Sequence, residues 1–441
     1  MTATNTAHTA PATPVVGVAL LGHGTVGRSV LQFIGESAND LTHRIGGRIE
    51  VRGVAVSNPD KHPDLDPQLV TTDAKALIER DDVDIVVEVI GGIEYPKELV
   101  LAALNAGKSV VTANKALVAA CSAELGEAAD RAGVDLYFEA AVAAAIPVVG
   151  PLRRSLAGDK VDTVMGIVNG TTNFILDAMD KTGASYDVML QEAMDLGYAE
   201  ADPTADVEGH DAASKAAILA SLAFHTRVNF SDVHCEGISN VSAEDVAAAK
   251  AAGYTIKLLA ICERITTDQG EEKVSARVHP TLVPISHPLA SVSKSFNAVF
   301  VEAEAAGKLM FYGNGAGGAP TASAVLGDLV GAARNKVHGG RAPGESTYAN
   351  LPIADFGEVT TRYHVDMNVA DQVGVLAEIA KVFADHGVSL RTVRQEEHDG
   401  AARLIVVTHA ALERDLQATV AALQDLSAVR SVNSVLRLHN D

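Results

Sequence analysis

The sequence predicts an α/β protein with three parts: a Rossmann-type doubly wound domain, an α+β domain and a C-terminal ferredoxin-like βαββαβ domain. Three observations predict this class. Short apolar runs alternate with Ala/Leu-rich helical stretches over residues 15–140, as in βαβ units of a parallel sheet. Longer strand patterns follow helices over residues 141–318. The order strand, helix, strand, strand, helix, strand then fills residues 359–441.

The boundaries follow from changes in composition. The Thr/Ala-rich N-terminus has no periodicity, and a Gly/Pro-containing stretch without periodicity separates the last part from the rest, so this part should be a separate unit with its own core. The expected parts are a disordered tail (1–14), a dinucleotide-binding domain (15–140) joined by a returning helix (319–337), a substrate and dimerisation domain (141–318), a linker (338–358) and the C-terminal domain (359–441).

Composition excludes several classes of protein. Among 441 residues, 56 acidic against 35 basic side chains give a net charge of −21, so we expect no nucleic-acid partner and no anionic membrane. The apolar runs are far shorter than the ~20 residues of a membrane span. No signal or transit peptide is recognisable, which indicates the cytoplasm. Three widely spaced cysteines and scattered histidines without HxxxH spacing predict neither disulfides nor a zinc site.

The motif GHGTVG places Gly22, Gly24 and Gly27 between an apolar strand and a helix. This context favours a dinucleotide site, because the glycines allow a tight turn, close approach to a pyrophosphate and close helix packing. Thr25 and Val26 open the helix whose N-terminus would face the phosphates. The alternative is a glycine turn needed only for packing.

The end of the second expected strand bears on the choice of cofactor. An NAD site would have Asp or Glu there to bind the ribose 2′-hydroxyl, but the strand ends in Ala55-Val56-Ser57-Asn58. Lys61 and His62 follow and could face a 2′-phosphate. The sequence therefore favours NADP, with NAD as the alternative because Asp60 is also near.

The segment TANKAL places Thr112, Asn114 and Lys115 at the carboxyl end of another expected strand. Ligands of open α/β sheets bind at such ends. A lysine at a helix start is electrostatically unfavourable without an anion, so Lys115 is a candidate for contact with cofactor or substrate rather than a solvated helix end.

The densest signal is LGYAEADPTADVEGHDAASK, where six carboxylates occur between Asp195 and Asp211. Such a run is usually a solvated face. Here it leads into an apolar helix in which Asp211 and Lys215 are four residues apart on one face. Lys215 could exchange a proton with a substrate hydroxyl if its pKa, ordinarily ~10.4, were lowered by burial or by a second cation such as Lys115.

The run from Ala193 to Lys215 resembles the motif of the homoserine dehydrogenase family. The segments GHGTVG, VTANKAL, FEAAVAAAIPVV, VNGTTNFIL, HPL (287–289) and GNGAGGAPTASAV occur in the family's order over about residues 15–340. The tail from Ala370 is similar to an ACT regulatory domain. The whole chain thus resembles the long bacterial form of the family.

The resemblance implies reversible oxidation of L-homoserine to L-aspartate 4-semialdehyde with NAD(P), on the pathway to threonine, methionine and isoleucine. It implies that Lys215 is the general acid/base, with Lys115 as its partner, and that Gly315 belongs to the cofactor site. The implied substrate-binding residues are Gly170, Thr171, Glu200, Asp206 and Asp211.

The resemblance also implies a sodium ion beside the site. Its ligands would be the Glu139 carboxylate and the backbone carbonyls of Val142, Ala144 and Ile146. The family commonly has glycine at the position of Ala144. If this residue has a positive φ, alanine costs ~1 kcal/mol.

For the tail, the resemblance implies a homodimer or homotetramer in which paired ACT domains bind L-threonine as an inhibitor. The implied effector residues are Asp371, Gly374, Val375, Leu376, Gly387, Val388 and Ser389. Two alternatives stay open: an ACT-regulated NAD(P) dehydrogenase of another amino acid, and a non-catalytic amino acid sensor.

Overall fold

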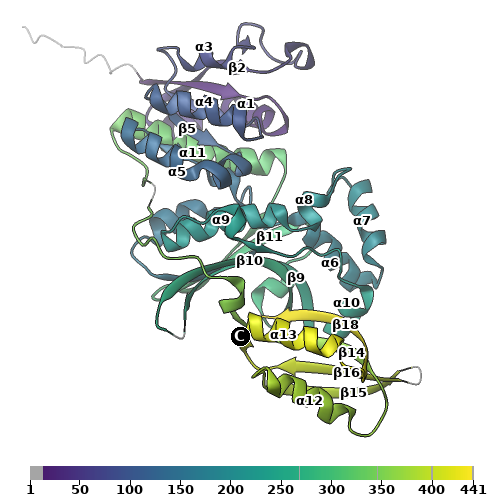
Figure 1. Cartoon of the computed structure of the whole chain (residues 1–441). Helices are drawn as coiled ribbons and strands as arrows, with labels where there is room; N and C mark the ends of the chain where they lie inside the picture. Colours follow the sequence, from purple (N-terminus) through teal and green to yellow (C-terminus); the bar gives the residue numbers. More distant parts are fainter. Residues whose placement is uncertain (1–12, 268, 345, 399–400, 440–441) are drawn as a thin grey trace, which may run out of the picture. The chain divides into compact units, whose positions relative to one another are not determined.

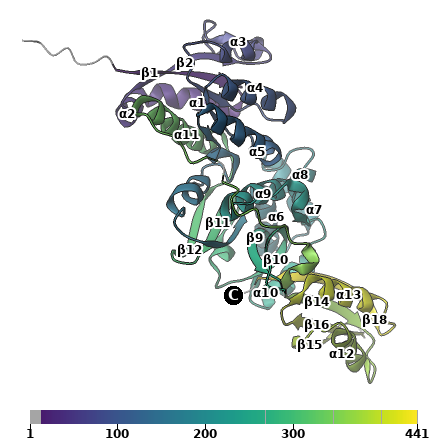
Figure 2. The ribbon, with the colours of Figure 1, turned by 60° about the vertical axis from the view of Figure 1, so that its left-hand side comes forward.

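The computed structural model describes residues 13–441 except 268, 345, 399–400 and 440–441. The expected disordered tail therefore lies almost wholly outside the described residues. The chain forms two compact units, Met1–Ala145 with Ala316–Glu345, and Ile146–Gly315 with Ser346–Asp441. Figures 1 and 2 show the elements of each unit.

The first unit contains a six-stranded parallel sheet in the order β3-β2-β1-β4-β5-β6. This is the Rossmann strand order, and the order reverses beside β1, which pairs with both β2 and β4. The predicted doubly wound fold is thus confirmed. The strands are β1 (Val15–Leu21), β2 (Arg48–Ala55), β3 (Val70–Thr71), β4 (Ile85–Glu88), β5 (Ser109–Thr112) and β6 (Leu136–Tyr137).

Helices cover this sheet in two groups that pack among themselves. In one, Val325 and Leu329 of the last helix enter the same core as Leu20 and Val30, so a segment distant in sequence completes this unit. The first group is α1 (Thr25–Glu36), α2 (Ala38–Ile45) and α11 (Gly318–His338), and the second is α3 (Ala74–Ile78), α4 (Glu94–Asn105) and α5 (Lys115–Ala132). Across the described ranges, no helix is both long and apolar enough to span a membrane.

The second unit contains a ten-stranded sheet in the order β12-β11-β7-β9-β10-β18-β14-β16-β15, with β8 paired to β10. Its first half carries helix α9 on one face, where the buried Cys262 thiol donates to the carbonyl of Ala216. The elements of this half are β7 (Val161–Ile167), α6 (Gly170–Thr182), α7 (Tyr186–Asp195), α8 (Thr204–Val207), α9 (His210–Phe224), β8 (His234–Cys235), α10 (Ala243–Ala251), β9 (Tyr254–Thr266), β10 (Glu272–Pro284), β11 (Phe296–Ala303) and β12 (Gly307–Asn314).

The C-terminal half has the predicted βαββαβ order (Figure 1). Its two helices contact each other and share a core built around Val365, Ile379 and Leu416. The ferredoxin-like part of the prediction is therefore confirmed. Its elements are β14 (Tyr363–Val369), α12 (Val375–Asp385), β15 (Leu390–His398), β16 (Ala401–Thr408), α13 (Glu413–Gln424) and β18 (Val429–Leu438).

The C-terminal half has its own core but belongs to the same compact unit as the first half. Strand β18 pairs in parallel with β10, with Thr281 opposite Arg437 and Leu282 opposite Leu438. The expected linker (338–358) is itself partly bound, because the N–H of Ala354 donates to the carbonyl of Val274. Pairing between strands so far apart in the chain leaves no signal in local composition.

Three separate segments therefore share one edge of β10. Ile353 bridges Val274, β8 pairs at Arg277–Val278, and β18 pairs at Thr281–Leu282. Strand β9 occupies the other edge along the whole length of β10. Both edges of β10 are thus paired, and the partners on this edge come from parts of the chain that sequence analysis assigns to different domains.

Candidate active site

Each glycine of the GHGTVG turn meets a different requirement. Gly22 has φ +103°, and a Cβ there would lie 2.8 Å from the carbonyl oxygen of Val89. A Cβ at Gly27 would lie 2.2 Å from the oxygen of Gly22, whereas Gly24 has open space around it. Helix α1 begins directly afterwards, at Thr25 and Val26. A sharp turn, an open approach and a helix N-terminus together fit the pyrophosphate of a dinucleotide.

At the carboxyl ends of β4 and β5, buried side chains fix the loops. The hydroxyl of Thr112 donates to the fully buried carboxylate of Glu88 at 2.5 Å, and the side-chain oxygen of Asn114 caps α5 by accepting from Leu117 at 3.1 Å. Lys115 is exposed at the first position of α5. Thr112 and Asn114 therefore shape this edge of the sheet from within, and Lys115 presents its charge at the helix start.

Two histidines meet beside the glycine turn, an arrangement that the sequence analysis missed. The Nδ1 atoms of His23 and His62 lie 3.3 Å apart, with the Asp64 carboxylate close enough for the three to hold a metal ion. Asp64 already pairs with Arg28 at 3.3 Å, and this guanidinium would repel a cation. Burial lowers the pKa of His23, against the attraction of Asp64. We therefore assign these side chains to the cofactor edge of the sheet rather than to a metal.

Lys215 and Asp211 form a buried pair on α9, four residues apart as the sequence predicts. The Lys215 ammonium donates to Asp211 at 2.8 Å and to the backbone carbonyl of Val168 at 2.6 Å. Both side chains are less than a tenth exposed. An ammonium has three N–H donors, so a lysine with these two acceptors has one donor left for a ligand.

Asn169 connects the two carboxylates, and the sequence analysis did not identify it. Its amide donates to Asp206 at 2.8 Å and to Asp211 at 2.9 Å, while its oxygen caps α6 by accepting from Thr172 at 2.8 Å. Thr171 adds a hydroxyl bond to Asp206 at 3.0 Å. The available signal was an asparagine directly before a helix, where N-caps are favoured. Asn169, Thr171, Asp206, Asp211 and Lys215 are called the substrate cluster below.

Three other predicted residues make no side-chain bond to the substrate cluster in the described part of the chain. A Cβ on Gly170 would be 2.7 Å from the carbonyl oxygen of Ser295, so this glycine permits close packing. Gly315 similarly packs on the side chain of Asn297, where a Cβ would meet the amide at 2.1 Å. Glu200 is exposed before α8 and, within the described ranges, has no hydrogen bond to the substrate cluster.

The segment with the implied sodium ligands contains left-handed alanines. Ala143 has φ +55° and Ala144 has φ +48°, so the condition for strain at Ala144 is met. The N–H of Glu139 donates to Asp328 at 2.7 Å, and Val142 and Ile146 are buried. The ligands that the resemblance implies, one carboxylate and three backbone carbonyls, are all oxygens, which suits a hard cation.

The implied effector residues lie at the two ends of α12. Gly374 (φ +98°) precedes the helix and Gly387 (φ +72°) follows it. Val375 and Val388 are buried, whereas Asp371, Leu376 and Ser389 are exposed. Residues 387–389 lead directly into β15, the strand at the edge of the described sheet.

A Rossmann sheet with a glycine turn, a buried lysine held by a carboxylate, and an ACT-like half define a regulated nicotinamide-dependent oxidoreductase. Residues 22–139 match the family description "Homoserine dehydrogenase, NAD binding domain", residues 147–330 match "Homoserine dehydrogenase", and residues 363–428 match "ACT domain". The chain belongs to the homoserine dehydrogenase family and is an NAD(P)-dependent oxidoreductase of amino acid biosynthesis.

Individual relatives cover nearly the whole chain. The homoserine dehydrogenase of Corynebacterium glutamicum is 74% identical over 427 residues, which is 97% of this chain and 96% of the relative. The crystal structure of a homoserine dehydrogenase from Thiobacillus denitrificans has a TM-score of 0.91 at 40% identity and covers 97% of this chain and 99% of its own. A hyperthermophilic archaeal homoserine dehydrogenase in complex with NADPH has a TM-score of 0.61 at 26% identity, covering 72% and 97%.

Proposed function

We propose that the substrate cluster binds L-homoserine or L-aspartate 4-semialdehyde, with Lys215 as the general acid/base. The bound nicotinamide accepts or supplies the hydride. In the oxidation, the neutral Lys215 amine takes the hydroxyl proton as the carbinol carbon loses hydride; in the reduction, its ammonium returns a proton to the aldehyde oxygen. The observation that carries this proposal is the buried Lys215 held between Asp211 and the carbonyl of Val168.

The carboxylates of the substrate cluster suit the substrate's ammonium group. Asp206 and Asp211 are held in place by Asn169, so they are oriented before the substrate binds. Glu200 and Gly170 complete the proposed substrate set, and Lys115 the proposed catalytic set, on the family resemblance.

The test is semialdehyde-dependent oxidation of NADPH by the purified protein. The proposal is supported if the protein turns over L-aspartate 4-semialdehyde and turns over the semialdehydes of other amino acids at most weakly. An ACT-regulated dehydrogenase of another amino acid would prefer its own substrate, and a non-catalytic sensor would bind nucleotide without turnover.

NADP is the proposed cofactor. The loop after β2 has Ser57 and Asn58 where an NAD site would have a carboxylate, while Lys61 is exposed on the same loop and His62 contacts His23 of the glycine turn. A relative binds NADPH. We expect a larger kcat/KM for NADPH than for NADH, and a reduced preference in Ser57→Asp. A wild-type preference for NADH would contradict the assignment.

Sodium is proposed at Glu139, Val142, Ala144 and Ile146, where the donors are all oxygens. Activity should rise when sodium replaces potassium at constant ionic strength, and Glu139→Gln should weaken this dependence. Equal activity in both salts would contradict the site.

Threonine is proposed to inhibit by binding at residues 371–376 and 387–389 across a pair of ACT domains. Inhibition requires different affinities of threonine for two states of the enzyme, a coupling typically of ~1–3 kcal/mol. A truncation would also remove β18 from the catalytic sheet, so a point variant is the cleaner test. Gly387→Glu should lose threonine binding in calorimetry and inhibition in the assay. Gly183→Glu is the matched control, because Gly183 also has φ +72° and open surroundings but follows α6.

A homodimer or homotetramer is the proposed assembly, in the cytoplasm. Val373 and Leu376, both exposed, lie on the proposed effector turn, and β15 is the last strand of the described sheet. Light scattering after size-exclusion chromatography would test the assembly, and a monomer would contradict both it and the shared effector site.

A further inference from the structure

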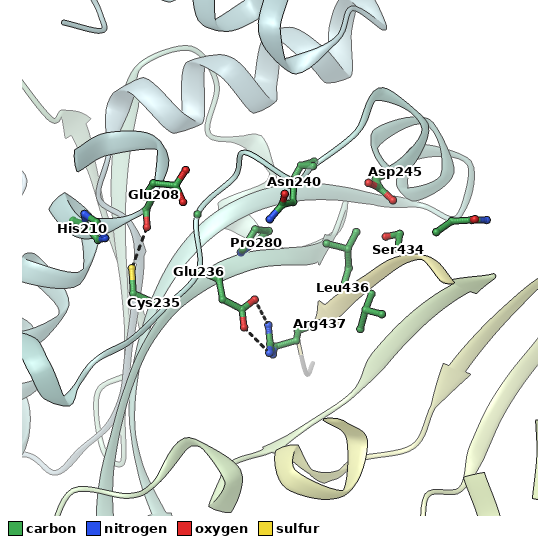
Figure 3. A pocket seen from close by; sticks show the side chains of 14 residues that line it. Glu208, His210, Cys235, Glu236, Asn240, Asp245, Pro280, Ser434, Leu436 and Arg437 are labelled. Carbon is green, nitrogen blue, oxygen red and sulfur yellow. Dashed lines mark hydrogen bonds and ion pairs between the residues drawn. The ribbon is translucent and has the colours of Figure 1, made fainter. Parts of the chain in front are cut away.

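Arg437, near the end of β18, is the main charged contact between the C-terminal strand and the catalytic half of the unit. Its guanidinium donates to Glu236 through two nitrogens, at 2.7 and 2.9 Å (Figure 3). It also donates to the buried Glu413 at 2.7 Å. Arg437 is 7% exposed. Bidentate pairs of this kind fix direction as well as distance.

The neighbours of Glu236 are bonded to the turn at Val207–Gly209. The thiol of Cys235 donates to the carbonyl of Glu208 at 3.3 Å, and the N–H of Ile238 donates to the carbonyl of Val207 at 2.8 Å. A Cβ on Gly237 would lie 2.3 Å from the carbonyl oxygen of Val207, so the 235–238 segment packs directly against the turn. A shift of Glu236 would therefore also move residues 207 and 208.

This turn joins the two helices that carry the carboxylates of the substrate cluster. Helix α8 ends at Val207, one residue after Asp206, and α9 begins at His210, one residue before Asp211. Gly209 has φ +83°, and a Cβ there would lie 3.0 Å from the sulfur of Cys235. A displacement of the turn must move both carboxylates relative to Asn169.

A cavity of about 470 Å³ separates the turn from the C-terminal strand, with walls that include Glu208, Glu236, Asn240 and Arg437 (Figure 3). Side-chain packing does not fill this space, so the ion pair supports the segment where packing is incomplete. Although burial opposes it, hydrogen bonds from His234 and Arg437 hold the pKa of Glu236 well below its usual value. The pair therefore stays charged throughout the neutral range.

We infer that Glu236 and Arg437 are positioning residues for the dehydrogenase reaction: through the 235–238 segment, the C-terminal strand fixes the turn that places Asp206 and Asp211. The two residues act through the turn and need no contact with substrate. The inference rests on the proposed substrate role of Asp206 and Asp211, and it holds with or without threonine.

The test compares two glutamates that form ion pairs between the two halves of the unit: Glu236 with Arg437 of β18, and Glu358 with Lys273 of β10. Glu236→Ala should raise the KM for homoserine roughly 5- to 20-fold and change kcat less than about 3-fold, with the KM for NADPH unchanged, as for lost ground-state positioning. Glu358→Ala is the matched control. Glu358 pairs with Lys273 of β10 at 2.9 Å, but it has no described bond to the turn. A wild-type KM in Glu236→Ala, or an equal rise in both variants, would overturn the inference.

Further variants separate this inference from its premise. Asp206→Asn should raise the KM for homoserine. If it does not, Asp206 does not bind the substrate, and the inferred positioning of Asp206 by Glu236 is contradicted as well. If Asp206→Asn raises KM and Glu236→Ala does not, only the positioning role fails. Glu236→Gln keeps partial hydrogen bonding to Arg437 and should give an intermediate KM with a melting temperature close to that of the wild type. This variant decides the matter should the alanine variant not fold.

Discussion

The glycine turn and the substrate cluster are built in opposite ways. The turn lies within six consecutive residues, and its function depends on what is missing: side chains at Gly22, Gly24 and Gly27. The cluster depends on polar side chains from the end of β7, α6, α8 and α9, joined by hydrogen bonds over as many as 47 residues of sequence. A local site can thus be altered by one Cβ, whereas a site built from distant segments depends on groups that never touch the ligand.

The largest effect should come from Lys215→Ala. Loss of the general acid/base should lower kcat by ~10²–10⁴, while the KM for NADPH stays within about 2-fold because the glycine turn lies on another unit. Steady-state kinetics in both directions measures this. A variant that keeps more than half of its turnover would rule out the role.

Gly27→Ala tests the local site. Its new Cβ would lie 2.2 Å from the oxygen of Gly22, so the turn must shift, and the KM for NADPH should rise by about 10-fold or more. Gly35→Ala is the control, since Gly35 lies in the same helix with nothing near its Cβ. Similar nucleotide affinity in both variants, by fluorescence titration, would show that packing at Gly27 does not shape the turn.

Lys257 is a second buried lysine in the substrate unit, bonded to the Asn173 amide oxygen and the Val292 carbonyl rather than to a carboxylate. Burial lowers its pKa from 10.5 to about 8. Below pH 8 the folded protein therefore bears the cost of a buried charge. Between pH 8 and 10.5 the folded state loses this proton before the unfolded state does, so Lys257 makes stability rise with pH.

Lys257→Met removes this contribution. The stability of wild type relative to the variant should increase by about 2 kcal/mol from pH 8 to pH 10, as a shifted pKa of this size requires. Urea unfolding at several pH values measures the difference. If the difference stays constant, Lys257 is not neutral in the folded protein at pH 10.

Asn169→Ala tests whether the cluster depends on its connecting amide. Asp206 and Asp211 would each lose a hydrogen bond, and the KM for homoserine should rise by about 10-fold, as expected for ~1.4 kcal/mol of lost orientation. Asn368→Ala, in a strand of the C-terminal half, controls for the loss of a hydrogen-bonded, half-buried amide. A rise of similar size in both variants would assign the effect to stability alone.

The smallest effect should come from Ala144→Gly. Glycine relieves the left-handed backbone at φ +48° but makes the unfolded chain more flexible, so the net gain in stability should be below about 1 kcal/mol. Thermal unfolding with and without sodium measures it. A loss of stability would show that Ala144 is not strained.

Local spacing predicts the glycine turn, the Asp211–Lys215 pair and most helices and strands, because neighbours in sequence produce them. It does not predict Asn169 as a connector, the meeting of His23 with His62, or the contact of Glu236 with Arg437, because each depends on strands or loops paired across the fold. The bridge between Ile353 and Val274 has the same origin, because the composition of residues 338–358 does not show which strand they contact.

The shared edge of β10 has a consequence for engineering this enzyme. Removing the C-terminal half, a direct way to abolish the proposed inhibition by threonine, would strip β18 from Thr281–Leu282 and expose unpaired N–H and C=O groups. Exposed edges of this kind recruit strands from other molecules and lead to aggregation. A variant designed to escape the proposed inhibition should therefore keep β18 and change only the surface residues at the ends of α12.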